Sequence, residues 1–502
     1  MINLGQLLEP YLPLALPAHA GNLPITDLTQ DSREVRAGSL FVALRGATHH
    51  GLEFAQQACE QGAVAILWEP GTGIEAPQLP SNVACVPVPD LPRLTGLIAD
   101  RFFGEPSAHL RICAFTGTNG KTTCAFLLAQ CMGRLGRSAA YIGTIGWGRI
   151  GALRSLAHTT PDAISVHRML AQLLGDGVRD VAIEVSSHAL DQHRIAGVRL
   201  YAAAFTNLTH DHLDYHRTML AYGDAKARLF AFPEVKQCIV NVGDDFGRHL
   251  AERLREDTRL IAAWIDTDED TDAWSQVRHL RARRVSCQTR GLTMDIDGTF
   301  GSVALQARLI GRFNAENLAI VLGCLLSLGI GAPQAAAALG ECEPPPGRME
   351  IVPSAGEGKP LAVVDYAHTP DALAKALGAL REHCAGELWC VFGCGGDRDP
   401  TKRPMMGTVA DTMADRIIVT DDNPRSENPQ VITHQIAAAF TRHMPQVIGD
   451  RAEAIATALR AARSSDVVLI AGKGHEDYQI YGATRREFSD RSEAMRYLRD
   501  AA

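Results

Sequence analysis

Residues 116–123 read Thr-Gly-Thr-Asn-Gly-Lys-Thr-Thr and lie between the apolar run 112–115 and a helical pattern over 124–135. A strand that runs into a glycine-rich turn and then a helix presents backbone N–H groups at the positive end of the helix dipole, where phosphate oxygens bind. Lys121 can reach the terminal phosphates, and the hydroxyl of Thr122 can bind Mg²⁺. The stretch therefore predicts an α/β domain that binds a nucleoside triphosphate.

The loop departs from the usual P-loop pattern at one position. That pattern has a glycine five positions before the second glycine, where this chain has Phe115. The first glycine is Gly117, which gives a shorter loop. The alternative is an ordinary tight turn with a surface lysine, but the strand before the loop and the helix after it favour phosphate binding.

The composition is that of an ordinary globular enzyme, with 46% hydrophobic and 21% charged residues. A length of 502 residues is typical of about three domains. The net charge of −8 and the absence of a Lys- or Arg-rich block argue against nucleic-acid binding. Residues 318–340 carry no charge, but Gly329 and Pro333 interrupt them, so we expect two buried helices and a turn rather than a membrane span.

The cysteine pattern and the N-terminus bear on location. The twelve cysteines are scattered and include no Cys-x-x-Cys pair, which favours reduced thiols over a disulfide framework. The N-terminal residues lack the basic region and the uninterrupted apolar core of a signal peptide. We therefore expect a cytoplasmic protein, and we expect it to be a monomer.

Strand and helix patterns divide the chain into three expected domains, at 1–91, 92–343 and 344–502. The clearest linker is Pro344-Pro345-Pro346-Gly347, because three prolines cannot continue a helix. Strands that alternate with helices favour largely parallel sheets. The sequence predicts an α/β protein with a central P-loop parallel-sheet domain and a C-terminal Rossmann-like α/β domain. The expected strands are 40–44, 63–67, 84–88, 139–142, 181–185, 202–207, 238–241, 361–365, 388–392, 416–420 and 467–471, with a helix at 54–61.

Two acidic or histidine-rich segments follow strands of the central domain. Glu184 ends an apolar strand, where a carboxylate can hold Mg²⁺ or cap the next turn. Residues 210–216 contain three His and two Asp, which zinc would suit, but the spacing matches no common zinc pattern. We favour one histidine as an unusual Mg²⁺ ligand. Lys226, on a helical stretch beyond, is by its own sequence context a solvated surface lysine.

Three loops of the C-terminal domain follow expected strands. Residues 393–399 fail the dinucleotide fingerprint, but their glycines allow a tight turn that projects Arg398. Residues 421–425 add Arg425, and two arginines at neighbouring strand ends suit bidentate binding of carboxylates. In residues 472–476, Glu476 can hold an ammonium group. The alternative for each loop is a set of turn residues with a surface charge.

Taken together, these motifs resemble the Mur ligases, the ATP-dependent amide-forming enzymes of bacterial peptidoglycan precursor synthesis. The resemblance runs along essentially the whole chain, and the short phosphate loop is the family's own variant. Within the family, Asp-Asn-Pro-Arg at 422–425 is similar to the branch that adds meso-2,6-diaminopimelate. The segments that carry the resemblance are 31–33, 117–123, 158–161, 184–187, 209–216, 311–317, 347–350, 365–368 and the three C-terminal loops.

The resemblance implies a role for each domain and for named residues. The N-terminal domain would bind the UDP-substrate, the central domain ATP, and the C-terminal domain the amino acid. Catalytic residues would be Lys121, Glu184, His212 and Lys226, and metal ligands Thr122, Glu184, His212 and Lys226. ATP would be bound by Gly117, Thr118, Asn119, Gly120, Lys121, Thr122, Thr123, Asn317, Arg348 and Asp365. The UDP-substrate would be bound by Gln30, Ser32, Ala47, Thr48, His49, Thr159, Thr160, Ser186, Gln192 and Arg194. Diaminopimelate would be bound by Arg398, Asp422, Asn423, Pro424, Arg425, Gly472 and Glu476.

The resemblance also implies the reaction. ATP would activate the D-glutamate carboxylate of UDP-N-acetylmuramoyl-L-alanyl-D-glutamate as an acyl phosphate, which the amine of diaminopimelate then attacks. The cofactors would be Mg²⁺ and a CO₂-derived carbamate on Lys226, which ligates a second Mg²⁺. A lysine-adding sibling and a folylpolyglutamate synthase-like ligase are the enzyme alternatives. A regulatory nucleotide-binding module is the non-enzyme alternative, against which the joint presence of Lys121, Glu184, His212 and Lys226 speaks.

Overall fold

The computed structural model describes residues 2–12, 16, 18–46, 49–71, 73–266, 273–288, 291–354 and 358–499. The chain forms two compact units, residues 1–121 with 136–238 and residues 122–135 with 239–502. Among the described residues, no helix combines the length and the apolar character that a membrane crossing requires. Each unit is taken in turn below.

The first unit begins with a four-stranded parallel sheet, in the order β3-β4-β5-β6. Successive side chains of a strand point to opposite faces, so Leu40 and Phe41 of β4 enter different cores. Helix α4 packs in the first core and α3 in the second. The elements of this region are β1 (Ile2–Asn3), α1 (Leu4–Leu8), α2 (Ala18–Gly21), β2 (Pro24–Ile25), β3 (Asp27–Thr29), η1 (Ser32–Glu34), β4 (Ser39–Ala43), η2 (Gly51–Phe54), α3 (Ala55–Glu60), β5 (Ala65–Trp68), β6 (Ala84–Pro87) and α4 (Leu91–Phe102).

The same unit holds five strands in the order β11-β7-β10-β8-β9. All are parallel except β9, which pairs antiparallel with β8. The carboxyl ends of β7, β10 and β11 meet at one edge, which is where ligands bind in parallel sheets. The elements are η3 (Pro106–His109), β7 (Arg111–Thr116), β8 (Ala139–Gly143), β9 (Gly146–Gly148), α6 (Ala163–Gly175), β10 (Asp180–Glu184), α7 (Ser187–Asp191), β11 (Ala202–Phe205), α8 (Leu213–His216), α9 (Met219–Ala227) and η4 (Arg228–Ala231).

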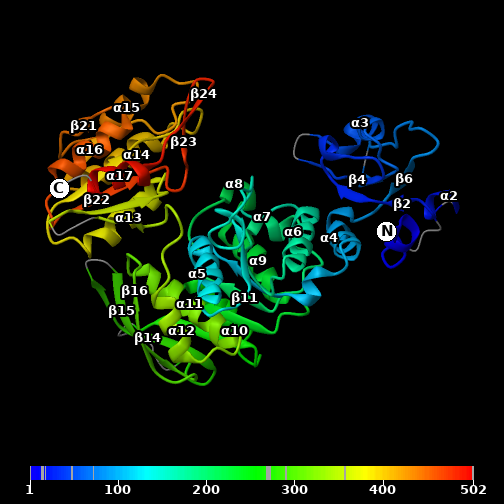
Figure 1. Cartoon of the computed structure of the whole chain (residues 1–502), viewed down its shortest axis with the longest axis horizontal. Coiled ribbons are helices and arrows are strands. Elements are labelled where there is room, and N and C mark those ends of the chain that lie inside the picture. The colour runs from blue at the N-terminus through cyan, green and yellow to red at the C-terminus, as the bar shows by residue number, and fades with distance from the viewer. Residues whose placement is uncertain are drawn as a thin grey trace. The chain divides into compact units, whose positions relative to one another are not determined.

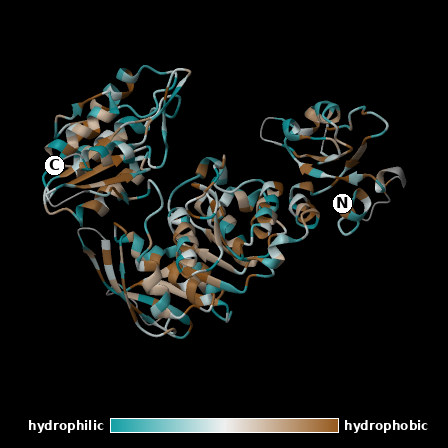
Figure 2. Ribbon diagram, viewed as in Figure 1, coloured by the Kyte–Doolittle hydropathy of each residue, from teal (hydrophilic) through white to brown (hydrophobic). Residues whose placement is uncertain are grey.

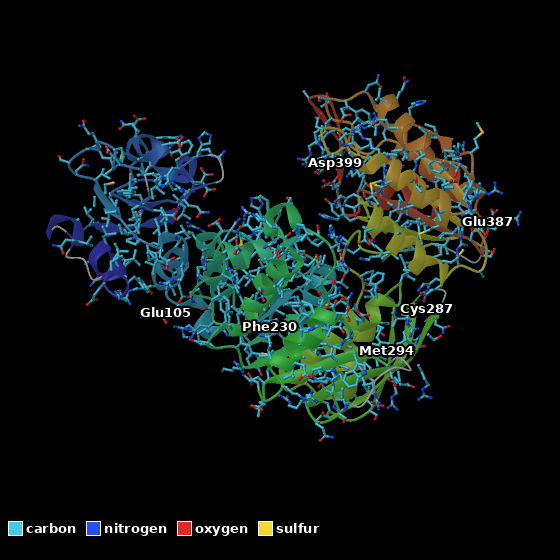
Figure 3. The ribbon with its side chains drawn as sticks, turned by 180° about the vertical axis from the view of Figure 1, so that it is seen from behind. Glu105, Phe230, Cys287, Met294, Glu387 and Asp399 are labelled. Carbon is cyan, nitrogen blue, oxygen red and sulfur yellow. The ribbon has the colours of Figure 1, made fainter. Side chains whose placement is uncertain are left out.

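In the second unit, five strands have the order β16-β15-β14-β13-β12. β14, β15 and β16 form an antiparallel meander, which the expected alternation of strands and helices missed. On β14, Arg281 and Arg283 pair with Asp297 of β15, so charges alternate with apolar residues as in a sheet with one solvated face. Figure 3 labels Cys287 of β14 and Met294 of β15, of which Met294 is buried. The elements are α5 (Lys121–Arg134), β12 (Gln237–Asn241), α10 (Asp245–Arg253), β13 (Leu260–Ile265), β14 (Arg278–Gln288), β15 (Gly291–Gly298), β16 (Val303–Ala307), α11 (Phe313–Ser327) and α12 (Ala332–Gly340).

The second unit also contains a six-stranded sheet in the order β17-β18-β22-β19-β20-β21, parallel except for β17. Helices cover both faces: α13, α14 and α15 pack on one core, and α16 and α17 on the other (Figure 1). Figure 2 shows the central strands in brown, as expected for strands buried on both faces. The elements are β17 (Glu350–Ile351), β18 (Leu361–Asp365), α13 (Pro370–Arg381), β19 (Leu388–Phe392), α14 (Lys402–Met413), β20 (Arg416–Val419), α15 (Pro429–Ala437), β21 (Gln446–Val447), α16 (Arg451–Ala461), β22 (Val467–Ala471), β23 (Tyr478–Tyr481), β24 (Thr484–Glu487) and α17 (Asp490–Arg499).

The expected α/β class with parallel sheets is confirmed. The pair α11 and α12 confirms that residues 318–340 form helix, turn and helix. The strands expected at 361–365, 388–392 and 467–471 have those bounds. The domain boundaries after residues 91 and 343 stay predictions.

Candidate active site

The phosphate loop connects β7 to α5 in a shape that requires glycine at its first position. Gly117 has φ +148°, and a Cβ there would lie 1.8 Å from Oγ1 of Thr206. The backbone N–H of Asn119 donates to Oδ1 of Asn207 at 2.9 Å, which binds the loop to the segment after β11. Phe115 is fully buried within β7. The position that is glycine in the usual pattern therefore belongs to the strand here, and the loop begins two residues later.

Two lysines converge on one carbonyl oxygen of this loop. The Nζ of Lys121 lies 2.9 Å from the oxygen of Gly117, and the Nζ of Lys226 lies 2.8 Å from the same oxygen. Lys226 is only 1% exposed, so the reading of it as a solvated surface lysine is wrong. Burial, and then repulsion by Lys121, lower the pKa of Lys226 well below its usual value, whereas Asp211 acts in the other direction. The site thus favours a neutral amine at residue 226.

Tyr222 links these lysines to the histidine-rich loop, a role that the sequence alone gave no reason to expect. Its hydroxyl lies 3.2 Å from Oγ1 of Thr118, and Nζ of Lys226 lies 4.3 Å from its ring centroid. The ring centroid of His212 is 6.0 Å from that of Tyr222 and 4.9 Å from that of His188. The structure therefore brings Thr118, Lys226 and His212 together around one tyrosine.

Glu184 is fully buried at the end of β10. Its Oε1 accepts hydrogen bonds from the hydroxyl of Tyr141 and, at 2.9 Å, from the backbone N–H of Thr144. The hydroxyl of Thr144 contacts that of Thr159 at 3.1 Å. Across the ranges that the structure describes, no three His, Cys, Asp or Glu residues are grouped so as to hold a metal ion. Glu184 and His212 are thus not parts of a preformed cage.

A cavity of about 1170 Å³ lies in the first unit, and Gln30, Ser32, Gln192 and Arg194 line it. These are four of the expected UDP-substrate residues. Thr160 and Ser186 are connected to the lining residue Arg194: Arg194 donates to the carbonyl oxygen of Thr160 at 2.8 Å, and the N–H of Ser186 donates to Oγ1 of Thr160 at 3.1 Å.

His49 is not among the lining residues, and its ring pairs with Glu53 at 2.9 Å. Ala47 and Thr48 lie outside the described residues. Seven of the ten residues expected to bind the UDP-substrate therefore lie at the cavity or are connected to its lining. This count includes Thr159, which is adjacent to Thr160 in the chain.

In the second unit, Thr122 and Thr123 lie in the first turn of α5, and Oδ1 of Asn317 is 3.5 Å from Sγ of Cys124 in the same turn. Further along the chain, Oδ2 of Asp365 accepts from the N–H of Met349 at 2.8 Å. The guanidinium of Arg348 lies 4.8 Å from the ring centroid of Tyr366. Burial raises the pKa of Asp365, and the charge of Arg348 opposes that shift. Arg348 and Asp365 are thus neighbours, and their role in binding ATP stays a prediction.

The first two C-terminal loops pack through glycines. A Cβ on Gly396 would lie 1.9 Å from the carbonyl oxygen of Pro424. Nη1 of Arg425 donates to the carbonyl oxygen of Gly396 at 2.6 Å. A Cβ on Gly395 would lie 2.9 Å from Nη1 of Arg425 and 3.9 Å from Cγ of Arg398. The two arginines that are expected to bind a carboxylate therefore flank the same glycine.

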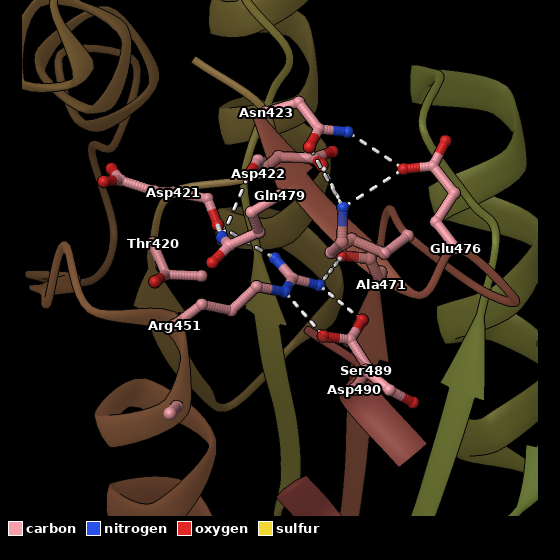
Figure 4. A network of polar contacts seen from close by, with 12 residues as sticks. Thr420, Asp421, Asp422, Asn423, Arg451, Ala471, Glu476, Gln479, Ser489 and Asp490 are labelled. Atoms are coloured by element: carbon pink, nitrogen blue, oxygen red, sulfur yellow. Dashed lines mark hydrogen bonds and ion pairs between the residues drawn. The ribbon is translucent and has the colours of Figure 1, made fainter. Parts of the chain in front are cut away.

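The second and third loops meet through side chains (Figure 4). Nδ2 of Asn423 donates to Oε2 of Glu476 at 2.9 Å. A Cβ on Gly472, which has φ +118°, would lie 3.1 Å from Oδ2 of Asp422. Lys473, which the sequence gave no reason to single out, is fully buried between these groups. All three loops thus form one cluster of arginines, carboxylates and an amide.

Three family models match the chain: the Mur ligase family catalytic domain over residues 24–103, the Mur ligase middle domain over 115–325, and the Mur ligase glutamate ligase domain over 347–474. The chain belongs to the Mur ligase family. This Mur ligase is an ATP-dependent ligase, as expected.

Relatives resemble this Mur ligase over its full length. It is 43% identical over 505 residues to UDP-N-acetylmuramoyl-L-alanyl-D-glutamate--2,6-diaminopimelate ligase of Alkalilimnicola ehrlichii, with 99% of each chain covered. It is 44% identical to the ligase of the same name from Xylella fastidiosa, with 99% and 97% covered. A solved structure of a ligase of that name has a TM-score of 0.72 at 32% identity and 98% coverage of both chains. Mycobacterium tuberculosis folylpolyglutamate synthase, at 17% identity and a TM-score of 0.58 over 76% of this chain and 92% of that one, shares the fold alone.

Proposed function

We propose that this Mur ligase adds meso-2,6-diaminopimelate to the D-glutamate carboxylate of UDP-N-acetylmuramoyl-L-alanyl-D-glutamate, with hydrolysis of ATP to ADP. The full-length relatives with that activity in their names support this assignment. The observation that carries it is the cluster of C-terminal loops, where Arg425 and Arg398 flank one glycine and Asn423 bonds to Glu476. Arginines suit a carboxylate, and Glu476 suits an ammonium group. The cluster therefore fits the distal end of diaminopimelate, which carries both groups, whereas the distal end of lysine carries only the amino group.

The phosphate loop and Lys121 would hold the triphosphate while the D-glutamate carboxylate attacks its terminal phosphorus. ADP leaves, and the resulting acyl phosphate is attacked at carbon by the amine of diaminopimelate. That amine loses a proton, the amide bond forms and phosphate departs. The protein forms no bond to the substrate in this route, so its contribution is to position the groups and to stabilise their charge.

Thr122, Glu184 and His212 are the proposed residues for Mg²⁺, which when bound would neutralise phosphate charge. Mg²⁺ usually keeps several waters and takes one or two carboxylates together with phosphate oxygens. Glu184, at the end of β10, is the one carboxylate among the three proposed residues, which suits that habit. Glu184 is oriented for such a role by Tyr141 and Thr144.

Lys226 is the proposed site of the carbamate. A neutral amine attacks CO₂, the N–C bond forms, and one proton is released to leave an anionic carbamate. Burial and Lys121 already lower the pKa of Lys226, which supplies the neutral amine. The carbamate would place a negative charge close to Lys121, because the Nζ atoms of Lys121 and Lys226 contact the same carbonyl oxygen of Gly117.

Phosphate release from ATP tests the assignment. We expect release only when the UDP-muramyl dipeptide and diaminopimelate are both present, and much less with lysine. Equal turnover with lysine would favour the lysine-adding sibling. Turnover of a folate with glutamate in place of the UDP-substrate would favour a folylpolyglutamate synthase-like activity and contradict the proposal.

A further inference from the structure

The third C-terminal loop contains a cation that no part of the proposed reaction has used. Lys473 is 0% exposed, and its Nζ lies 3.5 Å from Oδ1 of Asp422, 3.2 Å from Oδ1 of Asn423 and 3.1 Å from Oε2 of Glu476. A buried ammonium group is costly unless it is paired and hydrogen-bonded. Its three partners are all residues expected to bind the amino acid, so Lys473 connects the second loop to the third at the site itself.

The contacts of Glu476 are asymmetric. Lys473 and Asn423 both bond to Oε2, at 3.1 and 2.9 Å (the bond from Asn423 is drawn in Figure 4). No described residue donates a hydrogen bond to Oε1. One oxygen is therefore fixed by the protein, and the other is left to accept from a ligand.

Among the groups that contact Lys473, and leaving aside Arg398 and Arg425 at the expected carboxylate end of the site, one negative charge is in excess. Asp422 and Glu476 are two carboxylates, and Lys473 neutralises one of the two charges. The remaining negative charge suits a single ammonium group. The buried pair of Arg451 and Asp490, 2.7 Å apart, adds no net charge below the loops.

Arg451 supports a different part of the same region. Figure 4 shows its guanidinium between Asp490 and the carbonyl oxygens of Asp421 and Ala471, which it contacts at 3.4 and 2.9 Å. The carbonyl of Asp421 begins the second loop and that of Ala471 ends β22, so Arg451 fixes backbone whereas Lys473 fixes side chains. This contrast allows a structural role to be separated from a role in substrate choice.

We propose that Lys473 is a positioning residue, which holds Oε2 of Glu476 so that Oε1 accepts a hydrogen bond from the second ammonium group of diaminopimelate. The inference rests on the proposed function. Lys473 selects for that ammonium without touching the reacting atoms.

The test compares meso-diaminopimelate with 2-aminopimelate, which lacks the second amino group, as substrates of the full-length enzyme. The measured quantity is the ratio of kcat/KM for the two. In Lys473→Met we expect this ratio to fall at least about tenfold through a higher KM for diaminopimelate, since a charged hydrogen-bond partner is lost. The KM values for ATP and the UDP-muramyl dipeptide should stay within about twofold.

Two controls separate positioning from stability. Lys375→Met removes an exposed lysine that pairs with Asp371 at 2.7 Å, and it should leave the ratio unchanged. Asp490→Asn breaks the buried pair under the loops, so it should lower Tm but keep the ratio within about twofold. If Lys473→Met does not fold, Lys473→Gln replaces it in the same comparison.

A ratio in the Lys473 variant equal to that of the unmodified enzyme overturns the inference. So does a ratio that falls equally in Asp490→Asn, because the effect then follows stability. A failure of the unmodified enzyme to use diaminopimelate at all would instead refute the proposed function, so the two failures are distinguishable.

Discussion

At the scale of single residues, burial gives two lysines at one carbonyl oxygen different chemistry. Lys121 and Lys226 both bond to Gly117, but Lys226 is almost fully enclosed. Burial, and then repulsion by Lys121, lower the pKa of the enclosed amine of Lys226. A lowered pKa increases the fraction of Lys226 that is a neutral nucleophile, whereas Lys121 belongs to the phosphate loop, where an ammonium group suits phosphate.

The first prediction is that Lys226→Ala loses activity by at least about two orders of magnitude, which is typical when one preorganised charged group is removed. Short carboxylates such as formate or acetate should restore part of it, because they can occupy the place of the carbamate. Steady-state phosphate release with and without the added carboxylate measures this. Full activity of the variant without any supplement would refute the carbamate.

The pH dependence of carbamate formation follows from the same shift. Because the pKa of Lys226 is lowered, the amine becomes neutral at a lower pH than in an ordinary lysine, so the rate of recovery after CO₂ removal should stop rising at a lower pH. An unshifted lysine would show recovery that rises throughout the range from about pH 6 to about pH 9.

The second prediction concerns amino-acid choice. Arg425→Ala should lower kcat/KM for diaminopimelate. The expected loss of transition-state stabilisation is about 2–5 kcal/mol, by analogy with charge pairs from which one partner is removed. Its effect on lysine turnover should be smaller, because lysine lacks the distal carboxylate. Unchanged KM and kcat with diaminopimelate would exclude a role for Arg425 in binding that carboxylate.

At the scale of elements, the sequence predicted those strands whose position is determined by a local run of apolar residues. Strands β18, β19 and β22 have the expected bounds because they are apolar on both faces and are followed by polar loops. The meander of β14–β16 was missed because charged residues make its strands less apolar than the others, and because a register shift between Arg283 and Ser286 interrupts the alternation along β14.

The same limit applies to the candidate site. The motif loops could be found in the sequence because their residues are contiguous. The roles of Lys473 and Tyr222 could not, since each depends on a partner far away in the chain. Lys473 contacts nearby Glu476 but also Asp422, 51 residues away, and Tyr222 is 104 residues from Thr118. Lys226 was interpreted from its surroundings in sequence as exposed, yet the carbonyl that it contacts is 109 residues away.

The third prediction concerns the contact between two loops. In Gly396→Ala the added Cβ would meet the carbonyl oxygen of Pro424 at 1.9 Å, so the loop of residues 393–399 must move away from that of 421–425. We expect KM for diaminopimelate to rise at least about tenfold, because Arg398 and Arg425 would no longer flank Gly395 together. Gly133→Ala is the matched control: a Cβ in that turn of α5 meets nothing within 4 Å, and alanine there should stabilise by about 0.5–1 kcal/mol. Equal KM values in both variants would show that the loops tolerate separation.

At the scale of the whole molecule, the cysteines show how the chain protects its thiols without disulfides. All twelve are described, and none forms a disulfide. Eight are buried, and the other four, at positions 59, 85, 287 and 384, are partly enclosed. Burial raises the pKa of Cys113 to about 12, and burial together with Glu382 raises that of Cys287 to about 11. Burial thus favours the protonated form of Cys113 and Cys287 as well as covering them.

The fourth prediction follows from that protection. The thiolate is the reactive form, and a raised pKa leaves little of it at pH 8, so native protein should react slowly with a thiol-specific disulfide reagent and at no more than four sites. The rate at those sites should increase steadily from pH 7 to pH 9, since this range lies below the raised pKa values. After denaturation all twelve thiols should react at once. Fewer than twelve under denaturing, non-reducing conditions would mean that disulfides form, and rapid native reaction at more than four sites would mean that the buried cores open readily.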